Sequence, residues 1–180
     1  MMQTTGPSSP QETRGRFGRW MIIGAWILFL VLLTLLFSEW LQTRSNPNRS
    51  LTVVTDTKGE QVVTLKPNRA GHYLAPGKIN DLNVTFLLDT GATRVAVPGK
   101  LAKKADLPRG IRSQSQTASG VVESWLTRIE RLRLGPFEMR DVRAVIIPDM
   151  PGEEVLLGMS FLKHLELVQT GERLRLRLPD

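Results

Sequence analysis

The sequence lacks cysteine altogether and holds only two histidines, His72 and His164, in 180 residues. The absence of cysteine excludes a disulfide framework, a cysteine metal site and thiol catalysis. Two imidazoles are too few for a histidine-rich metal centre. We therefore expect no metal and no cofactor.

Aromatic side chains are absent from the stretch in which basic residues occur at every second position. Arg173, Arg175 and Arg177 alternate with leucines near the end of the chain, and the net charge is +7. Proteins that bind single-stranded nucleic acid interleave aromatic rings for base stacking. We interpret this stretch as a solvated strand face over a leucine core and favour it over a phosphate site. Nucleic acid is not an expected partner.

The first third of the chain does not have the composition of a globular domain. Residues 1–13 have hardly any apolar side chains, which predicts a disordered tail. An apolar run then extends from Trp20 to Phe37, interrupted only by Gly24 and Thr34. At about 18 residues it is long enough to cross a bilayer core, so we predict a transmembrane helix over residues 20–40.

Three arginines precede this run, whereas one follows it closely. This asymmetry predicts a single-pass inner (cell) membrane protein with a cytoplasmic amino terminus and a periplasmic remainder. A cleaved signal peptide is a less favoured alternative, because no small-residue cleavage site follows Leu36 and Phe37. A buried soluble helix is less favoured still, because no polar stripe breaks the run.

The rest of the chain is predicted to be rich in strands. Residues 51–65 form a plausible hairpin, either an arm or the first hairpin of the domain. We expect further strands near residues 78–84, 94–97, 121–126, 128–134, 142–147 and 165–168, and short helices at 100–105 and after 158. The predicted organisation is a tail (1–19), a transmembrane helix (20–40), a linker with a possible hairpin arm (41–70) and a folded domain (71–180).

One stretch organises that domain, Phe86 to Thr93, in which an apolar strand leads directly into Asp89. A strand packed on both faces appears as a continuous apolar run. It would hold Asp89 rigidly at the rim of a core, and Gly91 would allow close approach of backbone or substrate. Taken alone, Asp-Thr-Gly is equally consistent with a simple turn.

The triplet Asp89-Thr90-Gly91 resembles the active-site loop of aspartic proteases. A strand, Asp-Thr-Gly-Ala, a glycine-bearing hairpin, and two apolar residues before a glycine and short helix follow in the order of the retropepsin-like, or retroviral-type, family. The resemblance covers about residues 71–178. Its membrane-anchored bacterial branch is also similar at Gly71-His72-Tyr73 and at Leu156 to Leu162. The resemblance implies an all-β, closed-barrel protomer with one or two short helices.

Aspartic protease chemistry requires two carboxylates that share one proton. One carboxylate activates water while the other protonates the carbonyl of the peptide bond. The chain contains a single Asp-Thr-Gly. We therefore expect a homodimer in which each copy contributes Asp89, acting on a peptide or protein substrate, and a membrane tether would favour this pairing.

The family resemblance also assigns supporting roles. The Thr90 hydroxyl would bond across the two-fold axis, and the flap formed by Ala118, Ser119 and Gly120 would close over the substrate. Ala92 offers no hydroxyl to favour the ionised carboxylates, so we expect a working pH closer to neutral than in pepsin-like relatives.

Two alternatives stay open. The first is a non-catalytic, membrane-tethered binding module that keeps the dimeric fold but does not hydrolyse peptides. The second and weaker one is a serine hydrolase using Ser160, but Gly158-Met159-Ser160 lacks the second glycine of a nucleophile elbow.

Overall fold

The computed structural model describes residues 13–57, 59–117 and 120–179, with the backbone alone at 13–19 and 37–45. The flap residues Ala118 and Ser119 lie outside these ranges. The chain divides into two compact units, Met1–Gln42 and Thr43–Asp180. Each unit is described by itself.

The first unit is built on one long helix, α1 (Thr13–Ser45). Its described side chains, residues 20–36, are apolar apart from Thr34 and are exposed on every side of the helix. The Thr34 hydroxyl donates to the carbonyl of Leu30, at 2.7 Å, so its polar group is satisfied within the helix. Among the described residues, we find no helix that is both long enough and apolar enough to cross a membrane.

The second unit consists mainly of strands. Its elements are β1 (Thr52–Thr55), β2 (Gln61–Leu65), β3 (Leu74–Ile79), β4 (Leu82–Leu88), β5 (Val95–Pro98), α2 (Gly99–Lys104), β6 (Arg112–Thr117), β7 (Gly120–Leu134), β8 (Phe137–Ile147), β9 (Glu154–Leu157), α3 (Met159–Leu162), β10 (Glu166–Thr170) and β11 (Arg173–Arg177). The predicted short helices are present at α2 and α3.

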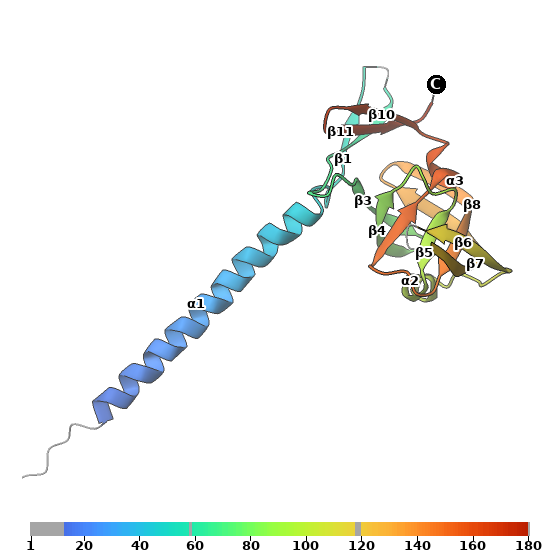
Figure 1. Ribbon diagram of the computed structural model, residues 1–180. Helices are drawn as coiled ribbons and strands as arrows, with labels where there is room; N and C mark the ends of the chain where they lie inside the picture. The colour runs from blue at the N-terminus through green and yellow to red at the C-terminus, as the bar shows by residue number, and fades with distance from the viewer. Residues whose placement is uncertain (1–12, 58, 118–119, 180) are drawn as a thin grey trace, which may run out of the picture. The chain divides into compact units, whose positions relative to one another are not determined.

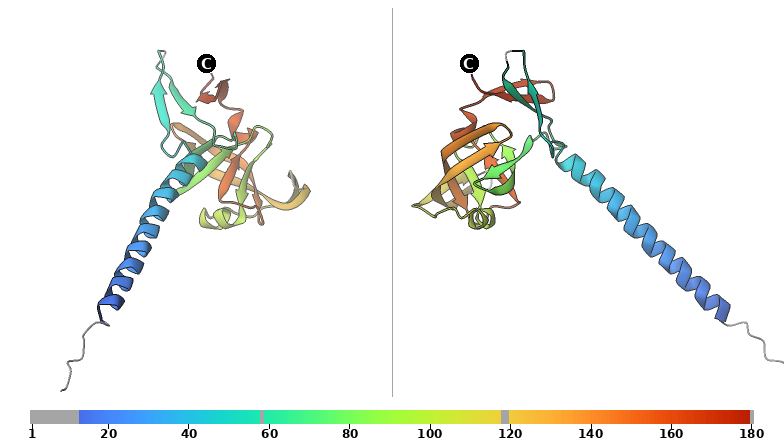
Figure 2. Two further views of the ribbon diagram at one scale, coloured as in Figure 1. Left: turned by 60° about the vertical axis from the view of Figure 1, so that its left-hand side comes forward. Right: turned by 180° about the vertical axis from the view of Figure 1, so that it is seen from behind.

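Strands β3 to β9 form a sheet that closes on itself. The strand order is β3-β4-β9-β5-β8-β7-β6, and an additional pairing joins β3 to β7 at Ile79 and Leu132. Figures 1 and 2 show these strands wrapped around a common interior. The tight turn between β3 and β4 places Asn80 at a φ of 52°, a conformation that asparagine tolerates better than most residues. The expected closed barrel is confirmed.

Strand β7 differs from the sequence-based expectation. We predicted separate strands at 121–126 and 128–134, but β7 runs unbroken for 15 residues. The buried polar residues inside it find partners: the Thr127 hydroxyl donates to the carbonyl of Pro108 at 2.7 Å, and the Ser124 hydroxyl accepts from Ser115 at 2.8 Å. Because these groups are satisfied, the strand can continue through the core without a break.

The segment before residue 71 joins the end of the chain in a second sheet. This four-stranded sheet has the order β1-β2-β11-β10, with Val63 of β2 opposite Leu176 of β11. The hairpin of residues 51–65 is therefore a structural part of the second unit. The predicted domain boundary at residue 71 itself stays a prediction.

The two sheets share one hydrophobic core. Val63 and Leu176 from the four-stranded sheet belong to the same cluster as Ile129 and Leu134 from the barrel, and all four are fully buried. Burial of each such side chain contributes about 1.5–3 kcal/mol. On β11, Arg173 and Arg175 are exposed while Leu174 and Leu176 are buried, as predicted for a charged face over a leucine core. The third arginine, Arg177, is half-buried and pairs with Glu166.

Candidate active site

Asp89 lies at the point where β4 leaves the barrel. Strands β4 and β9 are parallel, with Leu88 opposite Leu157, and the backbone N–H of Asp89 donates to the carbonyl of Leu157 at 3.2 Å. On its other side, the N–H of Leu88 donates to the carbonyl of Tyr73 at 3.0 Å. The half-buried Asp89 is thus anchored through the backbone from two directions, as its place after an apolar strand predicted.

The loop after Asp89 folds back onto its carboxylate. The N–H of Gly91 donates to Oδ1 of Asp89 at 2.9 Å, and the N–H of Ala92 donates to the Asp89 carbonyl at 3.2 Å. Thr90 and Gly91 are exposed, whereas Ala92 is half-buried. The triplet is therefore a turn, and the same turn orients a carboxylate that solvent reaches.

A second set of bonds fixes this loop to the start of α3. The N–H of Met159 donates to the carbonyl of Ala92 at 2.7 Å, and the N–H of Ser160 donates to the carbonyl of Thr93 at 3.0 Å. A Cβ atom at Gly158 would lie 2.4 Å from the Arg94 carbonyl oxygen and 2.6 Å from that of Ala92. Only glycine fits where the two segments cross.

Ser160 has a structural role that the sequence did not predict. Its hydroxyl donates to the carbonyl of Arg143 at 2.8 Å and accepts from the N–H of Val95 at 3.1 Å. It thereby ties α3 to the neighbouring strands β8 and β5. A serine whose hydroxyl is engaged in this way does not favour the serine hydrolase alternative. In the sequence, the only indication of this role was that Ser160 lies in the segment from Leu156 to Leu162, which resembles the family.

The predicted flap is the tip of the hairpin between β6 and β7. Thr117 pairs with Gly120 across it, and the Thr117 hydroxyl donates to the Gly120 carbonyl at 2.8 Å. Gly120 has a φ of 116°, which few other residues adopt. The hairpin is present, while the substrate contact assigned to Ala118, Ser119 and Gly120 stays a prediction.

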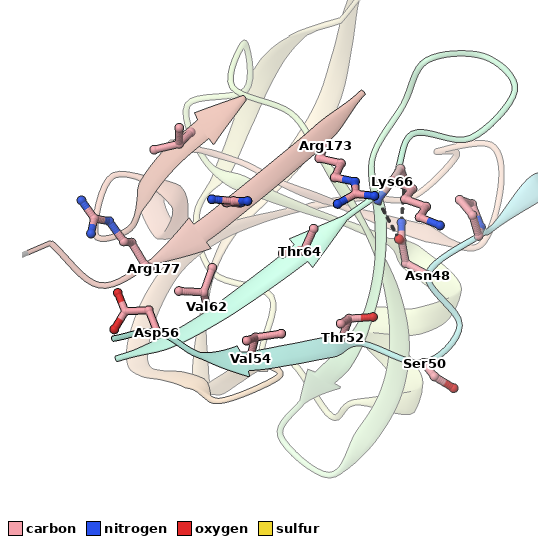
Figure 3. Close-up of a pocket in the computed structure, with 13 residues that line it drawn as sticks. Asn48, Ser50, Thr52, Val54, Asp56, Val62, Thr64, Lys66, Arg173 and Arg177 are labelled. Atoms are coloured by element: carbon pink, nitrogen blue, oxygen red, sulfur yellow. Dashed lines mark hydrogen bonds between the residues drawn. The ribbon is translucent and has the colours of Figure 1, made fainter. Parts of the chain in front are cut away.

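A spacious cavity of about 770 Å³ lies elsewhere, on the outer face of the four-stranded sheet. Its lining includes Lys66 and Arg173 together with Val54 and Val62 on β1 and β2 (Figure 3). Asn48, another lining residue, forms two hydrogen bonds with the backbone of Lys66, at 2.7 and 2.8 Å (Figure 3). Asp89 does not line this cavity, so its volume has no bearing on the carboxylate.

The chemistry that this arrangement supports is acid–base chemistry of a carboxylate. In the part of the chain that the structure describes, no cluster of three or more histidine, aspartate or glutamate residues could hold a metal ion. One oriented carboxylate can supply one of the two groups that a proton-sharing pair requires.

A family model described as "gag-polyprotein putative aspartyl protease" matches residues 75–164, which is half of the chain. The match includes the Asp89 loop, the β6–β7 hairpin and α3. The chain belongs to the retropepsin-like aspartic protease family.

Two solved structures illustrate what this retropepsin-like protein is similar to. The crystal structure of a retropepsin-like aspartic protease from Rickettsia conorii is similar with a TM-score of 0.54 and 22% identity, covering 63% of this chain and 97% of that one. The protease of EIAV in complex with the inhibitor HBY-793 has a TM-score of 0.41 and 24% identity, over 50% of this chain and 84% of that one. The first likeness supports the retropepsin-like fold.

A relative along almost the whole length comes from a Sinorhizobium species. It carries the name "Uncharacterized protein in cobV 5'region" and is 28% identical, covering 92% of this chain and 77% of its own length. That alignment therefore extends well beyond residues 75–164, the part that the family model matches.

Proposed function

We propose that this protein is an aspartic endopeptidase, active as a homodimer, in which Asp89 of each copy forms the catalytic pair. The observation that carries the proposal is the placement of Asp89, held by the Leu157 carbonyl on one side and the Gly91 N–H on the other. The chain has one Asp-Thr-Gly, so a complete pair needs a second copy. Membership of a family of aspartic proteases supports the same conclusion.

In the proposed reaction, one Asp89 is ionised and the other is protonated. The ionised carboxylate takes a proton from water, whose oxygen attacks the peptide carbonyl carbon, while the protonated one gives its proton to the carbonyl oxygen. As the C–N bond of the tetrahedral intermediate breaks, the carboxyl that took a proton from water gives that proton to the leaving nitrogen. One hydroxyl of the intermediate returns its proton to the other carboxylate, which restores the starting pair. Hydrolysis should then have a bell-shaped pH dependence. The pair is inactive at high pH, where both carboxylates are ionised, and at low pH, where both are protonated.

The neighbours of Asp89 have proposed roles that agree with their exposure. Thr90 is exposed on the loop, where its hydroxyl can reach the partner copy across the axis. Ala92 is held by α3 and has no hydroxyl to offer the pair. Gly120 begins the strand that leads out of the flap.

Helix α1 is the proposed membrane tether, with the amino terminus in the cytoplasm and the protease unit in the periplasm. The support is the apolar sequence of residues 20–37, interrupted only by Gly24 and Thr34, and the exposure of the described apolar side chains all round the helix. A periplasm-specific reporter fused after Asp180 tests this topology. Activity of a cytoplasm-specific reporter at the same position would contradict it.

The central test is replacement of Asp89 by Asn, which preserves shape and removes the ionisable group. An aspartic protease should lose all measurable cleavage of a proteome-derived peptide library, whereas Asp149→Asn, on an exposed loop, should cleave normally. Under the alternative of a non-catalytic binding module, the wild-type protein cleaves no peptide. The Asp89→Asn variant would then retain every bound partner.

A further inference from the structure

Three arginines lie side by side, two of them on adjacent strands and the third immediately before the next strand of the sheet. Arg128 of β7 is directly opposite Arg143 of β8 in the antiparallel register. Val95 of β5 pairs in parallel with Ala144 of β8, so Arg94, immediately before β5, lies next to Arg143. We call Arg94, Arg143 and Arg128 the arginine row. All three residues are exposed.

The arginine row is short of negative charge. Arg128 forms an ion pair with Asp141. Among the described residues, no carboxylate lies within 4.0 Å of Arg94 or Arg143. Like charges directly opposite one another destabilise a sheet, since their Cβ atoms are only about 4.5–5.5 Å apart. An anion bound between these side chains would relieve that repulsion.

The three arginines also line one cavity of about 370 Å³. The rest of the lining is mostly apolar, with Pro108, Gly110, Leu126 and Ala144, and the hydroxyl of its one other polar side chain, Thr127, donates to the Pro108 carbonyl. A cavity of this size admits a side chain of moderate length, and a guanidinium group binds a carboxylate through two parallel hydrogen bonds. The surroundings therefore match an acidic side chain with a short aliphatic stem.

The arginine row adjoins the loop that carries Asp89. Arg94 is five residues beyond Asp89, and its carbonyl lies beside that of Ala92 at the crossing with Gly158. A chain spans at most about 3.6 Å per residue, so the five residues from Asp89 to Arg94 limit the distance between them. An extended substrate covers a similar distance within about five residues of the cleaved bond, so side chains in that range can reach the row.

We propose that the arginine row is a specificity site, and that the protease selects peptides with aspartate or glutamate within about five residues of the bond it cleaves. This inference rests on the proposed peptidase function. Because a two-fold dimer presents the row twice, an acidic residue on either flank of the bond should accelerate cleavage, and one on each flank should accelerate it further.

The test uses the full chain in detergent and a proteome-derived peptide library, with cleavage sites identified by mass spectrometry. The wild-type protein should show enrichment of aspartate and glutamate at flanking positions. The double variant Arg94→Glu/Arg143→Glu should reverse this preference towards lysine and arginine. The matched control is Arg173→Glu/Arg175→Glu, which makes the same charge change on β11 and should keep the wild-type preference.

Synthetic peptides give the size of the effect. For the wild-type protein, replacing the preferred glutamate by glutamine should lower kcat/KM by about two- to fivefold for each arginine that pairs with the glutamate, the range of exposed ion pairs. Added salt should reduce this difference, since it screens exposed charges. If circular dichroism shows that the Arg94→Glu/Arg143→Glu protein is unfolded, the Arg94→Gln/Arg143→Gln protein replaces it. This variant should lose the preference for acidic peptides, and the salt dependence of the wild-type protein tests the same preference.

The possible outcomes distinguish failure of the specificity site from failure of the proposed peptidase function. Cleavage by the wild-type protein without acidic enrichment, or a preference that the Arg94→Glu/Arg143→Glu variant keeps, overturns the specificity site and leaves the peptidase standing. Absence of any cleavage that depends on Asp89 overturns both.

Discussion

Backbone atoms hold Asp89 in position, and within the described part of the chain it forms no ion pair. The Leu157 carbonyl holds its N–H, and the Gly91 N–H binds its carboxylate at 2.9 Å. An asparagine at this position keeps an oxygen for the Gly91 bond, so the loop should keep its shape. Inactive chains made in this way should still pair with active ones.

Mixing wild-type protein with an excess of Asp89→Asn chains should therefore suppress activity by forming mixed dimers. Activity should fall well below that of the same amount of wild-type protein mixed with Asp149→Asn chains. The measurement is peptide hydrolysis after subunit exchange has been verified by mass-tagged chains. Undiminished activity after complete exchange would show that a single Asp89 acts alone.

Ser160 is expected to stabilise the fold without taking part in chemistry. Replacing it by alanine leaves the N–H of Val95, a fully buried residue, without its partner. The free energy of unfolding should fall by about 1–3 kcal/mol. Denaturant unfolding measures this loss, and Ser50→Ala, at an exposed serine, should change stability little.

The same Ser160→Ala variant should hydrolyse peptides at the wild-type rate per folded molecule. Complete loss of turnover in a well-folded sample would instead favour a nucleophilic serine.

At the scale of the elements, local sequence patterns located most strands and both short helices. The apolar run before Asp89 became β4, and the alternating arginines and leucines became β11. The pairing partners were not predictable, because contacts such as Ile79 with Leu132 depend on how distant segments meet. The unbroken β7 was missed because Ser124 and Thr127 are polar in sequence and satisfied only in three dimensions.

The candidate site divides in the same way. The sequence predicted Asp89, its loop and the hairpin beyond it from composition and family resemblance. It did not reveal the crossing at Gly158, where a Cβ would be 2.4 Å from a carbonyl oxygen, because glycine also fills ordinary turns. The arginine row was equally hidden, since Arg94, Arg128 and Arg143 are far apart along the chain and meet only through strand register.

Pairing of β2 with β11 should contribute measurably to stability. Leu176 is fully buried in the shared core, whereas Leu178, two residues later, is 55% exposed. Leu176→Ala should lower the free energy of unfolding by about 2–5 kcal/mol, while Leu178→Ala should change it by less than about 0.5 kcal/mol. Equal effects in chemical denaturation would mean that β11 does not pack as described.

At the scale of the whole molecule, the proposed enzyme is incomplete as a single copy. One protomer supplies one oriented carboxylate, so activity should depend on association. Activity per chain in detergent should fall as the protein is diluted below its dimerisation constant, with the protomer remaining folded. Analytical ultracentrifugation over the same range gives the fraction of dimer. Full specific activity in a demonstrated monomer would contradict the shared site.

The four-stranded sheet also constrains the order in which the chain can fold during synthesis. Strand β2 leaves the ribosome early, but its partner β11 follows only after the whole barrel has been made. Contacts between such distant segments form slowly, because a long loop must close before they can repay its entropy. Until then Val63 and Leu65 have no cover from Leu174 and Leu176. The nascent chain should therefore pass through an interval in which this hairpin is available to chaperones or to the wrong partner.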